Sequence, residues 1–200
     1  MKKFPFVLLV LLFVASLQIL SSPLVVIENV TIIDADNPVR TEMTVVLEDG
    51  VIIAIEKSGS YKILVQKEDT FIDGTDKFLI PGLWDAHVHL TFIPELDYET
   101  AYSLFLMNGI TSIRDTGAIL KKLKPAIAFA KKNPLMTPRL FYSGPLLDGT
   151  PSVYKGTEPG YPELSVEINK DTNLMALVNS LIEQEVSFLK TYEMLSEEIF

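Results

Sequence analysis

Two histidines set two residues apart constrain this chain more than any other feature. His87 and His89 are the only histidines in 200 residues, and they follow an apolar segment that Pro81-Gly82 interrupts. The segment has the character of a buried strand, and side chains two apart on a strand point to the same side. The pair therefore has the geometry of two ligands on one metal ion, for which neutral imidazole suits zinc and its first-row neighbours. Two polar surface residues are the alternative interpretation.

Composition narrows the possible functions. A chain of 200 residues with 48% hydrophobic content can bury a substantial core in one or two domains. Its formal net charge of −9 argues against nucleic acid as a partner, because binding phosphates requires clustered Lys and Arg. The absence of cysteine excludes disulfides, thiolate metal sites and a cysteine nucleophile. With only two histidines, a Ser-His-Asp triad would have to take its histidine from this pair and would leave no pair for a metal.

The N-terminus resembles a targeting segment. Lys2 and Lys3 precede an apolar run, and the small residues Ser21 and Ser22 follow it, which predicts a secretory signal peptide over residues 1–22. The mature protein would then be exported, either to the periplasm or as a secreted protein. The alternative is an uncleaved membrane anchor, because an apolar run of about 17 residues is near the lower limit for spanning a bilayer.

Residues 24–77 show the pattern of short strands. Two β-branched runs, 24–27 and 30–33, are followed by apolar runs at 44–47 and 51–55. Asp49-Gly50 lies between the last two runs and predicts a hairpin. We expect a small β-sandwich from this region.

Strands and helices alternate from residue 78 onward. Apolar spacing predicts a helix over 98–108 that Gly109 closes, and another that ends near Lys132 with Pro125 near its start. A third helix is expected over 172–184, with Asp171 or Thr172 as its N-cap. The intervening strands are expected at 110–115, 139–144 and 186–190, and a long loop at 145–162. This alternation predicts an α/β fold, with a parallel sheet and right-handed helical crossovers.

The segment from Ile80 to His89 closely resembles the first-strand motif of the amidohydrolase superfamily, which comprises metal-dependent hydrolases built on a (β/α)8 barrel. The segment from Val186 to Tyr192 resembles the fourth strand of its imidazolonepropionase-like and Xaa-Pro dipeptidase-like members. The resemblance implies that residues 78–200 form the N-terminal half of a TIM-type barrel, about strands 1–4, and that residues 24–77 belong to a composite β-sandwich.

The same resemblance implies a metal site. His87 and His89 would bind the more buried ion. Lys190 would be carboxylated by CO2 and would help to bind one or two divalent ions, with zinc expected. Carboxylation turns a cation that would repel metals into an anion. The alternative for Lys190 is an ordinary lysine at a strand end whose ammonium reaches solvent.

Several further residues are weaker candidates. Asp85 faces the same way as His87, although a structural role is more usual than metal ligation. Asp115, together with Arg114 before it, ends a strand, where an ion pair or a hydrogen bond to neighbouring loops is expected. Trp84 is most simply a core residue. The Asp148–Pro151 loop lies on the side where barrel enzymes bind substrate, yet a solvated connection is an equal alternative.

Part of the family pattern has no counterpart in the 200 residues. In the family, the fifth and sixth strands each bring a histidine, and the eighth brings the aspartate that acts as general base; here no histidine follows His89 and no aspartate follows Asp171. We therefore expect the N-terminal part of an amidohydrolase that cleaves C–N bonds of small amides, dipeptides or cyclic amides. The alternative is a non-catalytic exported protein that pairs its open half-barrel with another polypeptide or with itself.

Overall fold

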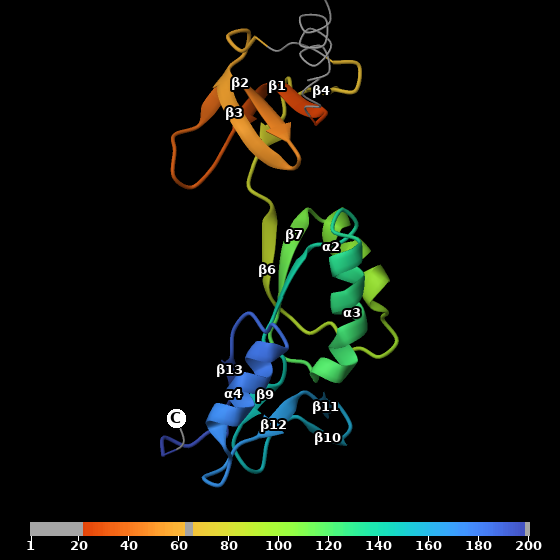
Figure 1. The fold of residues 1–200 in the computed structure, drawn as a ribbon, viewed down its shortest axis with the longest axis vertical. Coiled ribbons are helices and arrows are strands. Elements are labelled where there is room, and N and C mark those ends of the chain that lie inside the picture. The colour runs from red at the N-terminus through yellow and green to blue at the C-terminus, as the bar shows by residue number, and fades with distance from the viewer. Residues whose placement is uncertain (1–21, 63–65, 199–200) are drawn as a thin grey trace, which may run out of the picture. The chain divides into compact units, whose positions relative to one another are not determined.

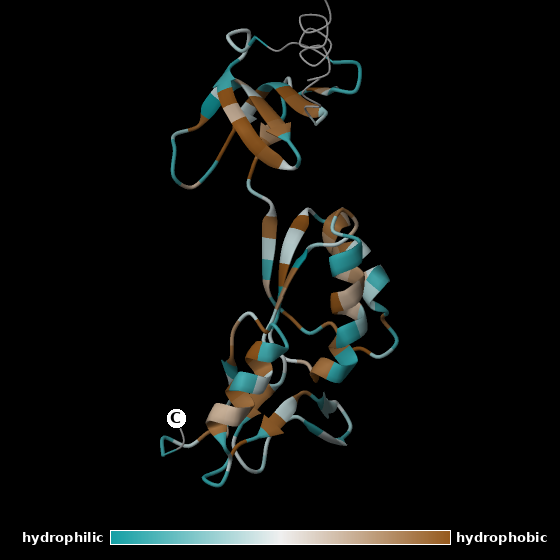
Figure 2. Ribbon diagram, viewed as in Figure 1, coloured by the Kyte–Doolittle hydropathy of each residue, from teal (hydrophilic) through white to brown (hydrophobic). Residues whose placement is uncertain are grey.

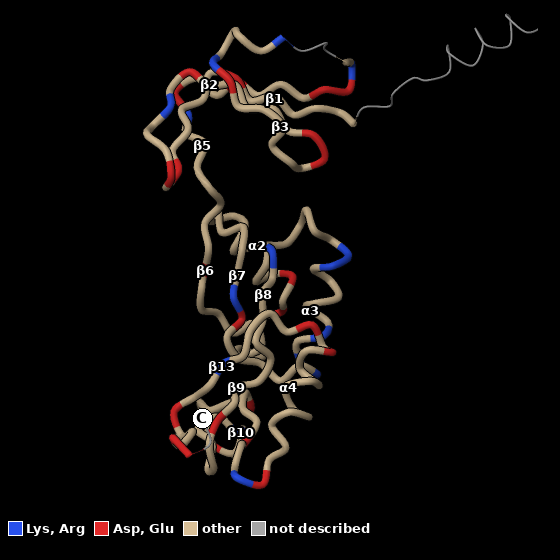
Figure 3. Tube along the Cα trace, turned by 60° about the vertical axis from the view of Figure 1, so that its left-hand side comes forward, with Lys and Arg blue, Asp and Glu red and all other residues tan. Residues whose placement is uncertain are grey.

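The computed structural model describes residues 22–62 and 66–198, which form two compact units, Met1–Pro81 and Gly82–Phe200. The predicted signal peptide lies outside the described residues, apart from Ser22 at its end. Among the helices of the described chain, none is both long and apolar enough to cross a membrane. Figure 3 shows acidic and basic residues interspersed along both units.

The first unit contains one mixed sheet. Its order is β3-β2-β1-β4, with β5 also paired to β1; β2 runs antiparallel to β1 and β3, whereas β4 and β5 run parallel to β1. The strands are β1 (Leu24–Ile32), β2 (Arg40–Glu48), β3 (Val51–Lys57), β4 (Thr70–Asp73) and β5 (Phe78–Leu79). Within the described residues these strands form a single sheet, because β4 and β5 hydrogen-bond to β1; the composite sandwich, whose facing layer would come from strands elsewhere, stays a prediction.

Local backbone geometry explains how these strands join. The predicted hairpin is confirmed: Asp49 and Gly50 connect β2 to β3 with φ of 49° and 76°, and two positive φ values match the turn that suits the twist of paired strands. The two runs predicted at 24–27 and 30–33 are one strand, irregular where Asn29 has a φ of 58°. Apolar residues dominate the sheet (Figure 2), and Val26, Val45 and others form its buried core.

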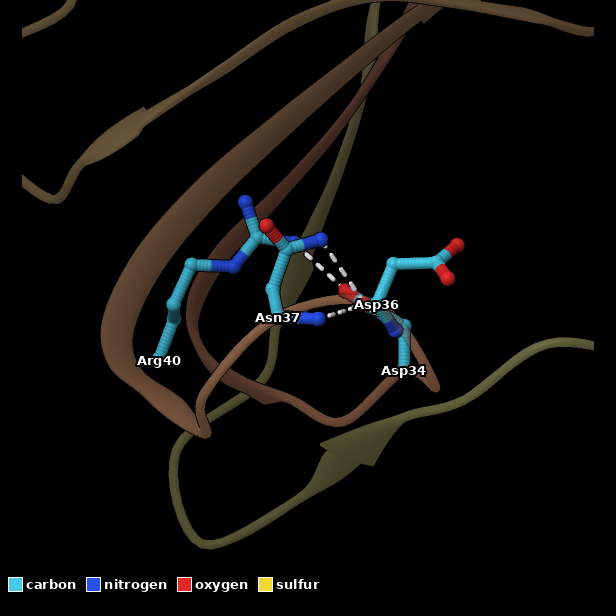
Figure 4. A network of polar contacts seen from close by, with 4 residues as sticks. All are labelled: Asp34, Asp36, Asn37 and Arg40. Carbon is cyan, nitrogen blue, oxygen red and sulfur yellow. Dashed lines mark hydrogen bonds and ion pairs between the residues drawn. The ribbon is translucent and has the colours of Figure 1, made fainter.

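A polar network closes the loop between β1 and β2 (Figure 4). Asp34 Oδ1 accepts hydrogen bonds from the backbone amides of Asp36 and Asn37 and from the Asn37 side chain, while Oδ2 accepts one from Arg40 at 2.7 Å. The Asn37 side-chain hydrogen bond is the main cause that lowers the pKa of Asp34. The network is an Asx-type turn and needs no ligand to explain it.

The second unit begins with a three-stranded parallel sheet in the order β6-β7-β8. Its elements are β6 (Leu83–Val88), α2 (Tyr98–Met107), β7 (Ile110–Asp115), α3 (Leu120–Lys132) and β8 (Arg139–Tyr142). Helices α2 and α3 lie on the same side of the sheet (Figure 1), and their buried residues Tyr102 and Leu123 belong to one core with Ile113 of β7. The predicted cap is confirmed, since Gly109 follows α2 with a φ of 76°.

The region after β8 is more ordered than the sequence predicts. The expected loop at 145–162 contains strands, because its backbone hydrogen-bonds to segments that follow it in the chain. The elements are β9 (Leu146–Asp148), β10 (Lys155–Glu158), β11 (Tyr161–Glu163), β12 (Ser165–Glu167), α4 (Leu174–Glu183) and β13 (Lys190–Thr191). The N-cap of α4 is Asn173, whose side chain accepts from the Ala176 amide, and not Asp171 or Thr172.

The predicted fourth strand lies beside the third. Ser187 donates its backbone N–H to the Tyr142 carbonyl at 2.8 Å, and Lys190 is in parallel register with Leu146. Only Lys190–Thr191 forms a regular ladder, so the strand is shorter than the predicted 186–190. The α/β class is confirmed, and the carboxyl ends of successive parallel strands meet at one edge of the sheet.

Candidate metal centre

Strand β6 brings its two histidines together where it ends. His87 and His89 approach each other to 3.3 Å between their Nε2 atoms, with ring centroids 5.1 Å apart. This is the proximity that the two-residue spacing predicts, because residues i and i+2 share one side of a strand. The two Nε2 atoms therefore lie side by side at the carboxyl end of β6.

The orientation of His89 is fixed by the loop after β7. Its Nδ1 lies 2.9 Å from the carbonyl oxygen of Gly117, and since a carbonyl only accepts, Nδ1 carries the proton and the unprotonated Nε2 is left as the acceptor that faces His87 Nε2. A Cβ on Gly117 would lie 3.1 Å from His89 Cε1 and 2.8 Å from Leu146 Cδ2. A side chain at position 117 would therefore force Leu146 to shift and would press on the imidazole.

The surroundings of His87 favour its neutral form. Burial lowers the pKa of His87, and the neighbouring positive charges of His89, Lys190 and Arg114 lower it further. Its backbone N–H is held by Asp85 Oδ1 at 3.2 Å. A neutral imidazole with an available nitrogen is the form that binds a metal ion.

Lys190, the third predicted ligand, is partly buried at the start of β13. Its positive charge is one of the causes that lower the pKa of His87. Within residues 22–62 and 66–198, no group of three or more His, Asp or Glu side chains could hold a metal ion. The donor set is thus two imidazoles, with Lys190 as the additional candidate.

Two aspartates at this edge organise the backbone. Asp85 holds the amide of His87, which is the structural role expected for it. Asp115 is completely buried and accepts hydrogen bonds from the amides of Leu90 at 2.8 Å and Gly117 at 3.1 Å, as expected for a strand end tied to neighbouring loops. Burial raises the pKa of Asp115 to about 6, against the opposing effect of these two hydrogen bonds.

Trp84 is not a core residue in the described chain. It is 50% exposed and stacks on Phe141 with ring centroids 4.9 Å apart. Its partner Phe141 alternates along β8 with Leu140 and Tyr142, which pack in the core with α2 and α3, so Trp84 lies on the side of the sheet that these helices do not cover. The prediction is wrong because an apolar side chain on a strand does not reveal which face will be covered.

Asp148 has a role that the sequence did not reveal. It is completely buried, and its carboxylate accepts hydrogen bonds from the amides of Gly149, Val153 and Met194. These contacts anchor the insertion after β9 and leave Asp148 out of contact with solvent. Gly117 was also not predicted as a site residue. The signal that could have identified it is an isolated glycine two residues after the aspartate that ends a strand.

No family model matches the sequence, and no curated protein shows a significant match. Among solved structures, the chain is similar to the ochratoxinase of A. niger, with 16% identity and a TM-score of 0.69 over 86% of this chain and 47% of that one. A putative prolidase from Bifidobacterium longum aligns with 22% identity and a TM-score of 0.65 over 88% and 42%. A Xaa-Pro dipeptidase with bound methionine aligns with 19% identity and a TM-score of 0.61 over 84% and 46%.

The chain spans less than half of the length of each of these structures. At these identities the similarity concerns the fold alone. The chain therefore has the fold of part of the amidohydrolase-family structures, which confirms at that level the resemblance carried by the segment from Ile80 to His89.

Proposed function

We propose that this chain is the N-terminal part of a metal-dependent amidohydrolase that cleaves C–N bonds in small amides, dipeptides or cyclic amides. The observation that carries the proposal is the imidazole pair of His87 and His89, with Nε2 atoms 3.3 Å apart at the carboxyl end of a parallel strand. Parallel-barrel enzymes place their chemistry at this end. The structural neighbours named as a prolidase and a dipeptidase support the substrate class.

The residues present fit one end of a divalent metal site. His89 offers Nε2 because Gly117 holds its Nδ1–H, and His87 is kept neutral by its surroundings. A divalent cation bound here would lower the pKa of a coordinated water towards neutrality and polarise a substrate carbonyl. The pair supplies two of the usual four ligands, so zinc binding by the 200 residues is expected to be weak.

Lys190 fits the site only after a change of charge. As an ammonium it opposes the binding of a cation beside His87, as its effect on the pKa of that residue indicates. Carboxylation by CO2 would replace the ammonium with an anionic carbamate that carries two oxygen ligands. We propose this modification for Lys190, and we expect zinc binding to strengthen when bicarbonate is supplied.

Calorimetric titration with zinc tests the proposal. The His87→Ala/His89→Ala double variant should lose zinc binding, whereas the exposed pair Glu197→Ala/Glu198→Ala removes two oxygen donors elsewhere and should leave binding unchanged. A histidine double variant that keeps the zinc stoichiometry of the natural sequence would refute the metal site and favour the non-catalytic interaction protein.

Activity provides a second test. The aspartate and the two histidines of the later family strands have no counterpart after Asp171 and His89, so the 200 residues alone should not hydrolyse dipeptides above the metal-ion background. Activity is expected when the chain is joined to the C-terminal half of a related enzyme, and Lys190→Ala should then reduce it sharply. Metal-dependent turnover by the 200 residues alone would show that the catalytic groups lie elsewhere.

A further inference from the structure

A closed loop of hydrogen bonds connects the ends of β6 and β7. Asp115 Oδ2 accepts the amide N–H of Leu90, which directly follows His89, while Asp115 Oδ1 accepts the amide N–H of Gly117. Gly117 in turn accepts the Nδ1–H of His89 at 2.9 Å. One carboxylate thus holds both the backbone that carries the imidazole and the backbone that carries its acceptor.

The two backbone amides are the main groups that stabilise the buried Asp115 carboxylate. Asp115 is completely buried, and within the described chain it forms no salt bridge with a lysine or arginine. A buried carboxylate without such a partner is costly, and its two hydrogen bonds to backbone N–H groups offset that cost. Each carboxylate oxygen therefore holds one of the two loops in place through a hydrogen bond.

Asp148 provides an internal comparison. It is equally buried and accepts hydrogen bonds from three backbone amides, but none of those amides belongs to a residue next to a histidine or to its acceptor. Both aspartates stabilise strand-end loops. Only Asp115 connects to the imidazole of His89.

We propose that Asp115 is a positioning residue that sets the orientation and the tautomer of His89. With both loops held by one carboxylate, the Gly117 carbonyl stays where it accepts the Nδ1 proton, and Nε2, which faces His87 Nε2, remains unprotonated. Outer partners of this kind commonly contribute about 10- to 100-fold to metal affinity. The consequence for metal binding rests on the proposed function, whereas the effect on the tautomer does not.

Asp115→Asn is the appropriate substitution, because it keeps the shape and leaves only one acceptor oxygen for two amide donors. Long-range 1H–15N correlation spectra report the tautomer directly, and with two histidines in the chain a His87→Gln spectrum assigns the signals. We expect the natural sequence to carry the proton of His89 on Nδ1, and Asp115→Asn to shift it towards a mixture. Zinc affinity, followed by NMR titration, should fall about 10- to 100-fold.

Asp148→Asn is the matched control. It disturbs a carboxylate with more backbone donors, so it should lose stability and yet leave the His89 tautomer and zinc affinity within about twofold of the natural sequence, since its amides lie outside the partners of the imidazole. A folded Asp115→Asn protein with an unchanged tautomer, or an equal change in Asp148→Asn, would overturn the proposal. A tautomer shift in a protein that never binds zinc would support the role of Asp115 and refute the metal site.

The natural sequence decides the matter if Asp115→Asn does not fold. A proton on Nε2 of His89, or rapid hydrogen exchange of the Leu90 and Gly117 amides, would overturn the proposal. A proton on Nδ1 with both amides protected supports it, because those are the bonds that Asp115 is inferred to hold.

Discussion

Gly117→Ala is the substitution that most directly tests the geometry around His89. The new Cβ would lie 2.8 Å from Leu146 Cδ2 and 3.1 Å from both Leu146 Cγ and His89 Cε1. Ordinary contacts of a Cβ begin near 3.4 Å, so a neighbour has to move by several tenths of an ångström. The contact with Leu146 Cδ2 forces a shift at a side chain that is only 1% exposed, and the tight contact with Cε1 presses on the His89 ring at the same time.

The magnitude follows from two opposing effects. Overpacking of a filled site costs about 1–3 kcal/mol. Replacement of glycine by alanine recovers roughly 0.4–1 kcal/mol by restricting the unfolded chain. We therefore expect a net loss of about 1–2 kcal/mol in the free energy of unfolding, together with a zinc affinity reduced about 10-fold or more through the displaced imidazole.

Urea denaturation and zinc titration measure the two quantities separately. Gly156→Ala is the control, because its Cβ would lie 3.0 Å from Glu163 Cβ and Gly156 has a φ of 75°, so stability falls without contact to a histidine or to the peptide that orients His89. Zinc binding by Gly156→Ala should remain that of the natural sequence. If Gly117→Ala loses stability but keeps full zinc affinity and the Nδ1–H tautomer, the imidazole does not depend on this close approach.

Three further predictions concern single groups. The pKa of His87 should lie below 6.5 by NMR titration, since burial and nearby cations lower it. The contribution of the neutral His87 to the free energy of unfolding is then complete above pH 6.5 and is lost as the pH falls through the lowered pKa. His87→Gln should remove that part of the acid sensitivity. A midpoint at or above 6.5 would contradict this. Asp148→Ala leaves three backbone amides without their acceptor, one of them in a buried hydrogen bond and two in partly buried ones, and should reduce the free energy of unfolding by about 2 kcal/mol or more in urea. A loss below about 1 kcal/mol would show that water replaces the carboxylate. Tyr102→Phe removes a buried hydroxyl that donates to the Ala126 carbonyl at 3.1 Å, and thermal or urea unfolding should show a loss of about 1 kcal/mol, whereas an unchanged protein would mean that the hydroxyl contributes no net stability.

Local patterns in the sequence were sufficient for much of the fold. The two-residue spacing of His87 and His89 fixes their common side on a strand, and Asp49-Gly50 fixes a hairpin, because each property depends on a few consecutive backbone angles. The alternation of strands with helices near Tyr98 and Leu174 likewise follows from short-range periodicity. The α/β class and the pairing of the two histidines therefore follow from the order of the residues alone.

Contacts between distant segments decided the rest. No local pattern shows that β4 and β5 join β1 in one sheet, that Trp84 lies on the less covered face, or that Asp148 anchors an ordered insertion, since each depends on what another part of the chain supplies. The same holds for the Gly117 carbonyl that orients His89 across 28 positions. The sequence by itself placed two imidazoles side by side, and only the tertiary structure determined which nitrogen of His89 carries the proton.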